Sequence, residues 1–448
     1  MVYTVAIIFL VFALSWWRPE VGLAVSVQSY LIRSAVNPPA YADQTNITND
    51  DPFLSAAVPA IIFGVIIIKM FRRENQRFRF NIRLLDSLFY LLGAVLLFGS
   101  IYSPLKNDAV LVSLKFFILG ISYYYFARLY FSKHVDVTKA AINFMNATWV
   151  LAITLGSYAY IKSFGLDYFR LTIGNAHPIP FSLLIASGIL INIYWLFKPG
   201  TKSIQKIMLL VPLFLLLVIF ISANTRGTIV SLAVSLVFIL LAALFQGKVR
   251  MRQFLIGILG LFGAFYLVLN ILPDTIETVK NNLELIVSSE HGVSIDERSM
   301  AHRDALRLFN DHIMFGVGTA GFKNYSEIVY AHNAFLEVLS ENGLIGGIAL
   351  GLIFLVISAM LLKIIFKHTG VTLLIASLVV LNMVEMQFSF TLWMHKWFFL
   401  FCGLLVSIMV AEKKHVDNLR VEREPTTEKL TLTNPLINTR SPLINKYK

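Results

Sequence analysis

Charged residues and cysteine are scarce in this sequence. Only 14% of its 448 residues are charged and 57% are hydrophobic, whereas a soluble domain carries about 25% charged residues. These proportions exclude an ordinary soluble globular domain and indicate that lipid is the solvent for most of the surface. The single cysteine, Cys402, lies in an apolar run, so an intramolecular disulfide is excluded and no thiolate metal site is indicated.

Acidic residues are also outnumbered by basic ones, which gives a net charge of +12. In a membrane protein, Lys and Arg gather in the short cytoplasmic loops and set the orientation of the helices. We therefore expect a lipid bilayer, and not a nucleic acid, as the partner of this charge. The first apolar run, Val2 to Trp17, lacks a basic start and a clear small-x-small cleavage site, and we interpret it as a retained membrane helix.

Apolar runs of about 20 residues, long enough to cross a bilayer, recur along the chain. The candidate spans are 53–70, 84–100, 109–127, 142–161, 180–197, 206–223, 227–245, 255–272, 344–366, 371–389 and 397–411. Residues 1–34 form either one broken span or a tight pair that turns at Arg18-Pro19-Glu20. We favour one span, which predicts an all-α, polytopic transmembrane helix bundle of about 12 spans with both ends inside. A pair would give thirteen, with the N-terminus outside.

Basic residues occupy every second gap between these spans. They are Arg72, Arg73, Arg77, Arg79 and Arg83, then Arg128, Lys133 and Lys139, then Lys198, Lys202 and Lys206, and then Lys248, Arg250 and Arg252. With these loops in the cytoplasm, the polar segment 273–343 lies outside. We thus expect an N-terminal transmembrane bundle (1–272), a large extracytoplasmic loop (273–343), C-terminal transmembrane helices (344–411) and a polar, disordered cytoplasmic tail (412–448).

The loop 273–343 contains two predicted amphipathic helices that lie along the outer membrane face. The first has a capping box from Ser294 to Glu297 and then apolar residues on one side: Ala301, Ala305, Leu308 and Phe309. Gly316 and Gly318 end it. The second starts near His332 with Phe335, Leu336 and Leu339 on one side, and it stops at Asn342-Gly343.

Two arginines on the outer side are candidates for anion binding. Arg226 lies at the outer end of a membrane hairpin, where the distribution of basic residues disfavours an arginine; the alternative is an anchor at the membrane interface. Arg298 opens the first loop helix beside Glu297, and its alternative is a surface ion pair. Arg303 competes with Arg298, although Arg298 lies closer to the apolar side, and the sequence leaves open which of them binds phosphate.

His332 is the candidate general base. A single histidine near an aromatic residue is often only structural, but this one lies at a predicted helix N-terminus, where the dipole disfavours the imidazolium form. A neutral ring is what a base requires. Asn333 beside it is a candidate for orienting the ring or a substrate hydroxyl.

Arginines and a neutral base on one side of the membrane are suited to a diphosphate and a hydroxyl. Arginine binds phosphate oxygens through paired donors and keeps its charge. The loop has no DxD-type carboxylate cluster, and the His and Cys residues show no metal-ligand spacing. We therefore expect no metal and no cofactor, and a transfer in which arginines neutralise a departing diphosphate.

These residues resemble the motifs of the O-antigen ligase/polymerase family, polytopic enzymes that build bacterial surface polysaccharide. Thr225-Arg226-Gly227 is similar to the family's Arg-Gly step. The segment Arg298 to Gly318 is similar to its Arg-x₃-Trp, Asp-His-Pro and Gly-x-Gly elements, with His302 in place of Trp and Ile313 in place of Pro. His332-Asn333 through Gly343 is similar to its His-Asn-x-x-Leu segment. The resemblance covers about residues 200–411.

The resemblance implies a metal-independent, inverting glycosyltransferase in the bacterial inner membrane, with its active site facing the periplasm. The donor would be an undecaprenyl-diphosphate-linked glycan. His332 would take the proton of the acceptor hydroxyl, Arg226 and Arg298 or Arg303 would bind the diphosphate, and Asn333, Gly316 and Gly318 would support the site.

The sequence leaves the acceptor open, and two functions of other classes remain as alternatives. The acceptor is lipid A-core for a ligase, which we favour slightly, the growing polysaccharide for a polymerase, or a protein hydroxyl for an O-oligosaccharyltransferase. A polysaccharide transporter or flippase would use ionisable residues within spans, and Asp86, Lys115 and Glu385 are the few in or near them; for Glu385 we favour helix packing. A structural subunit of an export complex would leave the outward arginines unexplained.

Overall fold

All regular secondary structure in the part of the chain that the computed structural model describes is helical. The structure describes residues 2–36, 52–71, 83–132, 134, 136–164, 170–248, 251 and 293–423, without the side chains of 2, 52–56, 70–71, 293–296 and 414–423. Seven of the described helices are long and apolar enough to cross a membrane, and three shorter ones are also apolar. This confirms the predicted all-α class. The predicted span 255–272 and residues 273–292 lie outside the described residues.

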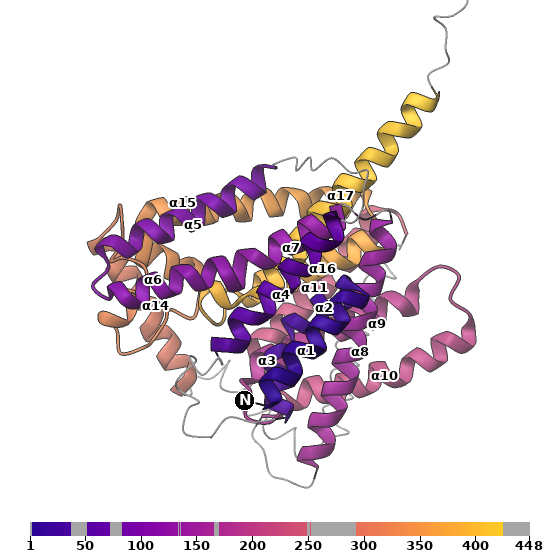
Figure 1. Cartoon of the computed structure of the whole chain (residues 1–448), viewed down its shortest axis with the longest axis horizontal. Coiled ribbons are helices and arrows are strands. Elements are labelled where there is room, and N and C mark those ends of the chain that lie inside the picture. The colour runs from indigo at the N-terminus through magenta and orange to yellow at the C-terminus, as the bar shows by residue number, and fades with distance from the viewer. Residues whose placement is uncertain are drawn as a thin grey trace, which may run out of the picture.

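The helices form one bundle in which α15 and α5 lie side by side along one edge (Figure 1). Their bounds follow the predicted apolar runs to within a few residues for most spans. They are α4 (Pro52–Phe71), α5 (Leu84–Tyr102), α6 (Lys106–Lys115), a π-helix (Phe116–Ile121), α7 (Ser122–Ser132), α8 (Val137–Ser163), α9 (Pro178–Phe197), α10 (Ser203–Ser222), α11 (Arg226–Phe245), α14 (Val293–Asp311), α15 (Ala334–Lys367), α16 (Val371–Glu385) and α17 (Lys396–Arg423). The predicted span 109–127 is thus continuous but contains a π-helical turn.

The N-terminal region corrects the preferred prediction of one broken span. Helix α1 (Val2–Trp17) turns back at Arg18, and α2 (Pro19–Val27) and α3 (Ser29–Val36) pack against it. A Cβ on Gly22 would lie only 2.5 Å from Ser15 Cα, so the two helices touch closely. Pro19 at the first helical position and the glycine at the contact favour this pair. The count of about 12 spans is not reproduced among the described residues.

Hydrogen bonds place the turn at Arg18 at the same end of the bundle as the basic loops. Lys69 Nζ donates to Trp17 O at 3.4 Å, and Tyr130 OH donates to Glu20 Oε2 at 2.6 Å. Tyr130 directly precedes the basic segment that leads into α8. A hairpin that turns at this end returns both of its ends to the opposite one, as the alternative of an N-terminal pair requires.

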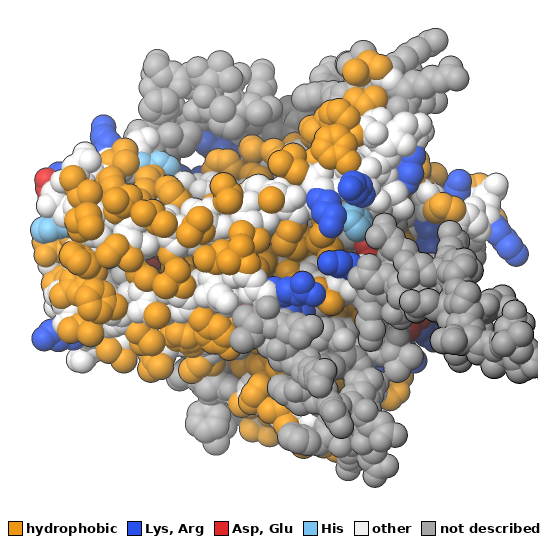
Figure 2. Space-filling view, turned by 90° about the horizontal axis from the view of Figure 1, so that it is seen from above, with side chains coloured by type: hydrophobic (Ala, Val, Ile, Leu, Met, Phe, Trp, Pro, Cys, Tyr) orange, Lys and Arg blue, Asp and Glu red, His pale blue; other side chains and the backbone are white. Residues whose placement is uncertain are grey.

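The outer surface and the core of the bundle differ as expected for helices in lipid. Large apolar side chains are exposed along α5, α10 and α15, including Phe98, Val211 and Leu355, and hydrophobic side chains spread across the face seen in Figure 2. In the core, Phe89 packs against Tyr124 with ring centroids 4.7 Å apart and against Phe399 at 5.4 Å. Aromatic contacts at these distances stabilise the association of α5, α7 and α17.

The polar loop packs onto the bundle through α14 and the first part of α15. Ala301, Ala305 and Leu308 are buried and Phe309 is partly buried, as predicted for the apolar side of α14. The predicted capping box falls on residues 294–297, most of whose side chains are not described. The predicted stop at Gly343 is present as a break inside α15, where Gly343 has φ +61° and ψ −155°.

The glycine-rich turn after α14 is joined to this break by backbone hydrogen bonds. Val317 N donates to Ser340 O at 3.0 Å and Gly318 N donates to Glu341 O at 2.8 Å. Glu341 is buried, and its Oε2 accepts from Ala320 N at 2.8 Å. The buried carboxylates of Glu337 and Glu341 were not anticipated for a helix on the membrane surface. At the other end of the chain, α17 runs to Arg423, past the predicted end of the last span at 411, and residues 424–448 lie outside the described ones.

Candidate active site

The end of α16 brings two of the predicted site residues together. Ala334 N donates to Met386 O at 2.9 Å, and this anchors the backbone two residues after His332. On the other side, a Cβ on Gly227 would lie 3.0 Å from Glu385 Oε1, so the residue after Arg226 touches the same turn. Arg226 and His332 therefore belong to one end of the bundle, the end opposite the basic loops.

Arg226 is the first residue of α11, and its position is fixed by the turn before it. Asn224 has φ +46°, a conformation that Asn adopts more readily than most residues, and it is buried. Thr225 Oγ1 hydrogen-bonds to Ser182 Oγ on α9. The short turn between α10 and α11 thus places Arg226, which is partly buried, at the start of a membrane helix.

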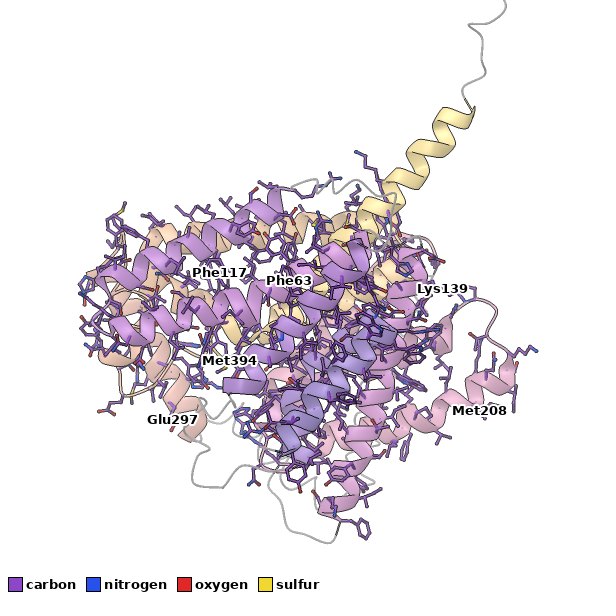
Figure 3. All side chains as sticks on the ribbon, in the orientation of Figure 1. Phe63, Phe117, Lys139, Met208, Glu297 and Met394 are labelled. Atoms are coloured by element: carbon purple, nitrogen blue, oxygen red, sulfur yellow. The ribbon has the colours of Figure 1, made fainter. Side chains whose placement is uncertain are left out.

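Arg298 and Arg303 lie in different environments on α14. Arg298 is partly buried and its Nε is buried without a hydrogen-bond partner, whereas Arg303 is exposed. Glu297, beside Arg298, is exposed at the edge of the molecule (Figure 3). Lys139, in the first turn of α8, lies on the other side of the molecule in the same view. The structure therefore brings Arg298 toward the other candidates and leaves Arg303 at the surface.

His332 is held in an unusual backbone conformation beside an aromatic ring. Its φ is +53°, which costs roughly 1–2 kcal/mol for a residue with a side chain. Its ring lies 4.3 Å from the ring of Tyr330, and its Nδ1 is buried without a partner. A strained residue with an unused buried nitrogen is typical of a functional position.

The His332 imidazole is kept neutral mainly by burial. Burial, followed by the positive charge of Arg298 and the neighbouring His302 and His177, lowers its pKa from 6.5 to about 4. The sequence suggested the helix N-terminus as the cause, whereas burial is the largest one. Burial and Arg298 lower the pKa of His302 as well.

Asn333, Gly316 and Gly318 have structural contacts that account for them. Asn333 caps α15, since its Oδ1 accepts from Phe335 N at 2.9 Å, and its Nδ2 donates to Gln387 O at 3.2 Å. Both glycines have positive φ, +70° and +93°, and a Cβ on either would lie 2.4 Å from backbone atoms of neighbouring segments. These residues hold the site together through the backbone.

Sequence reasoning missed two residues, Arg170 and His177, in the loop between α8 and α9. Arg170 is partly buried, and burial followed by the positive charges of Arg226 and Arg298 lowers its pKa. Burial, then Arg170 and Arg298, lowers the pKa of His177 to about 4. The only signal in the sequence was an arginine in another gap that the basic-loop pattern assigns to the outside.

The site therefore combines several positive charges with neutral imidazoles. Electrostatic influence of this kind requires the groups to lie near one another, and Arg298 acts on Arg170, on His177 and on His332. Burial raises the pKa of Tyr330 to about 12 against the charge of Arg298, so Tyr330 stays a neutral hydroxyl. Glu385, also near Arg298, accepts from Ser231 Oγ at 3.0 Å and joins α16 to α11. Such a site can bind a multiply charged anion and accept a proton.

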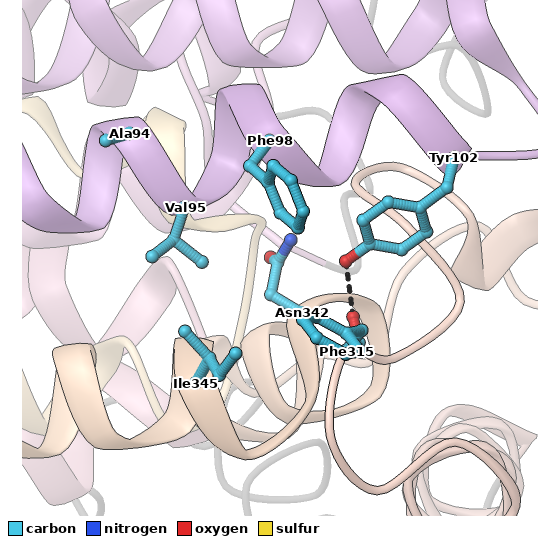
Figure 4. Close-up of a pocket in the computed structure, with 7 residues that line it drawn as sticks. All are labelled: Ala94, Val95, Phe98, Tyr102, Phe315, Asn342 and Ile345. Atoms are coloured by element: carbon cyan, nitrogen blue, oxygen red, sulfur yellow. Dashed lines mark hydrogen bonds between the residues drawn. The ribbon is translucent and has the colours of Figure 1, made fainter.

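The other intramembrane charges lie in packing contacts. Asp86 forms a buried ion pair with Arg128, at 3.2 Å between Oδ2 and Nη2, and Lys115 Nζ lies 4.6 Å from the ring centroid of Trp393. Figure 4 shows a separate pocket of about 250 Å³ between α5 and α15. Its walls are apolar apart from Tyr102 and Asn342, and Tyr102 OH donates to Phe315 O at 2.5 Å. This pocket carries none of the arginines or histidines of the site.

One protein family matches the central part of the chain. Residues 211–351 match the model of the O-antigen ligase family, which confirms the predicted resemblance over a shorter range than the expected 200–411. The match includes Arg226, Arg298 and His332 and excludes Arg170 and His177. A search of the curated proteins finds no match to the chain.

Proposed function

Because the chain carries an O-antigen ligase family domain at residues 211–351, we propose that it transfers a glycan from an undecaprenyl-diphosphate donor to an acceptor hydroxyl on the periplasmic side of the inner membrane. The family domain supports a reaction of the O-antigen ligase or polymerase type in general. The observation that carries the finer proposal is that the positive charge of Arg298 acts on Arg170 and on His332 together, with Arg226 acting on the same Arg170.

In this proposal Arg226 and Arg298 bind the diphosphate of the donor. Guanidinium groups make paired, charge-assisted hydrogen bonds to phosphate oxygens and keep their charge in a partly buried site. They stabilise the negative charge that grows on the diphosphate as the bond to the anomeric carbon breaks. Diphosphate is a good leaving group, so the reaction needs no separate acid.

His332 accepts the proton of the acceptor hydroxyl as the oxygen attacks the anomeric carbon. In the unliganded site its pKa is about 4 because of burial and Arg298, which makes the ring neutral but weakly basic. A bound diphosphate neutralises the arginines and so raises the basicity of His332 when the donor is present. Direct displacement by the hydroxyl inverts the anomeric centre.

The acceptor distinguishes a ligase from a polymerase, and the donor-binding residues are common to both. We propose lipid A-core as the acceptor, with the growing polysaccharide as the second candidate. In a deletion strain, loss of all polymer from the core together with accumulation of lipid-linked polymer supports the ligase. Core that bears a single repeat unit instead supports the polymerase.

The deciding experiment is an in vitro reaction of the purified full-length protein with lipid-linked glycan and candidate acceptors in the presence of a chelator. We expect transfer to continue with the chelator and to be lost in His332→Ala, at unchanged protein level and melting temperature. Transfer at nearly the wild-type rate by His332→Ala would exclude His332 as the base. Movement of donor across vesicle membranes without any transfer product would favour a flippase.

A further inference from the structure

The loop 170–177 lies outside the family domain, yet it is built as a fixed turn beside the arginines. Leu171 and Ile173 are fully buried, and Leu171 N donates to Ser222 O at 2.9 Å. Thr172 Oγ1 donates to Ala176 O at 2.8 Å and closes the turn. Because Ser222 ends α10 only four residues before Arg226, Arg170 is anchored to the same hairpin as Arg226.

The charges around Arg170 call for an anion with more than one negative charge. Burial and the positive charges of Arg226 and Arg298 lower the pKa of Arg170, which means that the three guanidinium groups repel one another in the empty site. Folding holds them together in spite of this repulsion. Glu385, near Arg298, already accepts from Ser231. A diphosphate carries more than one negative charge and can accept hydrogen bonds from several guanidinium groups at once.

His177 has one of its two ring nitrogens committed to a backbone contact. Its Nδ1 accepts from Ile179 N at 3.3 Å and caps α9, and its ring contacts the ring of Phe390 at 4.9 Å. Burial, Arg170 and Arg298 keep the ring neutral, with a pKa of about 4. A neutral imidazole whose Nδ1 accepts carries its proton on Nε2, so Nε2–H is a hydrogen-bond donor with a fixed position.

The two histidines of the site therefore differ in chemistry. The Nδ1 atom of His332 is buried without a partner, so no backbone contact at that atom fixes which nitrogen carries the proton. His177 is tied to a backbone N–H and can only donate through Nε2. One ring is suited to accept a proton and the other to donate a hydrogen bond.

We propose that Arg170 and His177 complete the donor site, Arg170 as a third guanidinium on the diphosphate and His177 as a neutral donor, through Nε2–H, to one of its oxygens. This inference rests on the proposed function. His177 transfers no proton: the acceptor proton goes to His332, and the diphosphate leaves with the electron pair of the broken C–O bond.

The test measures binding of geranyl diphosphate, a soluble prenyl diphosphate, to the full-length protein in detergent through the concentration dependence of its melting temperature. We expect Arg170→Gln to weaken binding about tenfold or more, the effect of one lost charge-assisted hydrogen bond. Lys162→Ala is the matched control, because Lys162 is exposed at the end of α8 that leads into the loop, and we expect it to bind as the wild type does.

Two variants separate donor binding by His177 from simple capping of α9. Asn and Asp cap helices about equally well, and the nearby positive charges of Arg170 and Arg298 stabilise an ionised Asp, so His177→Asp should melt no lower than His177→Asn without ligand. Asn still offers an N–H donor, whereas Asp offers only an anion that would oppose the diphosphate. We expect His177→Asn to retain most of the binding and His177→Asp to lose about tenfold or more.

The outcomes distinguish this inference from the proposed function. If the wild type binds geranyl diphosphate and Arg226→Gln does not, while Arg170→Gln and both His177 variants bind normally, the loop is structural and only this inference fails. If His177→Asn and His177→Asp lose binding only in proportion to lost thermal stability, His177 is a cap and its role as donor fails. If the folded wild type does not bind the probe, the diphosphate site itself fails.

Discussion

The carboxylate of Glu385 lies directly against Gly227: a Cβ added to Gly227 would meet Glu385 Oε1 at 3.0 Å. The same α16 end receives a hydrogen bond from Ala334 N through Met386 O. The turn at the end of α16 therefore sets the distance between Arg226, which precedes Gly227, and the candidate base His332. This contact gives a physical reason for glycine after the arginine in this segment.

We expect Gly227→Ala to lower glycan transfer about tenfold. The new Cβ would contact both Glu385 Oε1 and Phe388 Cβ at 3.0 Å, so α11 must move from α16 by a few tenths of an ångström, and small misplacements of binding groups are costly to catalysis. Gly351→Ala is the control, since its Cβ would have only Phe335 at 3.9 Å. Transfer assays with melting temperatures compare the two; equal activity would show that the contact does not position Arg226.

Arg298→Ala should reduce donor binding and transfer at least tenfold, whereas Arg303→Ala should change them less than about twofold. Arg298 is partly buried beside the site and Arg303 is exposed on the same helix. The two variants therefore remove the same charge from α14, one at a partly buried position and one at the surface. Initial rates over a range of donor concentrations provide the measurement. The reverse order of effects would assign the phosphate to Arg303.

The pH dependence should report the lowered pKa of His332. The ring is neutral above its pKa of about 4, so kcat/KM should be constant near neutral pH and fall as the pH drops through about 4, since this ratio reports the free enzyme. Removing the positive charge with Arg298→Gln raises the pKa, so the residual activity of that variant should fall at a higher pH than in the wild type. If the acid limb lies at the same pH in both proteins, Arg298 does not lower the pKa of the titrating group, which contradicts its assignment to His332.

The sequence predicted the helical class and most span positions, and it supplied Arg226, Arg298 and His332 for the proposed site, because each has a local signal. Apolar runs mark the spans, and Arg226 and Arg298 are basic residues where the orientation pattern disfavours them. Arg170 and His177 were missed because their relation to the site depends on Leu171 N reaching Ser222 O, a contact between residues 51 positions apart.

Other differences also arise from tertiary contacts. The N-terminal pair depends on Gly22 packing against Ser15, and apolar length alone cannot distinguish a hairpin from one broken span. The buried Glu341 is compatible with its helix only because the glycine-rich turn supplies backbone donors, such as Ala320 N at 2.8 Å. The lowered pKa of His332 was expected in direction, but its main cause is burial, which a sequence does not display.

The glycine-rich turn gives a test of stability that is separate from chemistry. Gly318 has φ +93° and Gly247 has φ +67°, so alanine is strained at both positions, by about 1–3 kcal/mol. Only at Gly318 would the Cβ also collide, with Ser103 Cα at 2.4 Å, whereas nothing lies within 4 Å at Gly247. Overpacking adds about 1–3 kcal/mol, so Gly318→Ala should lower the melting temperature and the yield of folded protein clearly more than Gly247→Ala.

Activity per folded molecule completes this comparison. Gly318 N donates to Glu341 O and acts on the site only through the backbone, so the Gly318→Ala protein that does fold should lose less transfer per molecule than Arg298→Ala, which should fold normally. Equal melting temperatures for Gly318→Ala and Gly247→Ala would show that the turn can open at no cost. In that case the packing of the turn against α5 and α15 would not be what fixes α14, and with it Arg298, over the site.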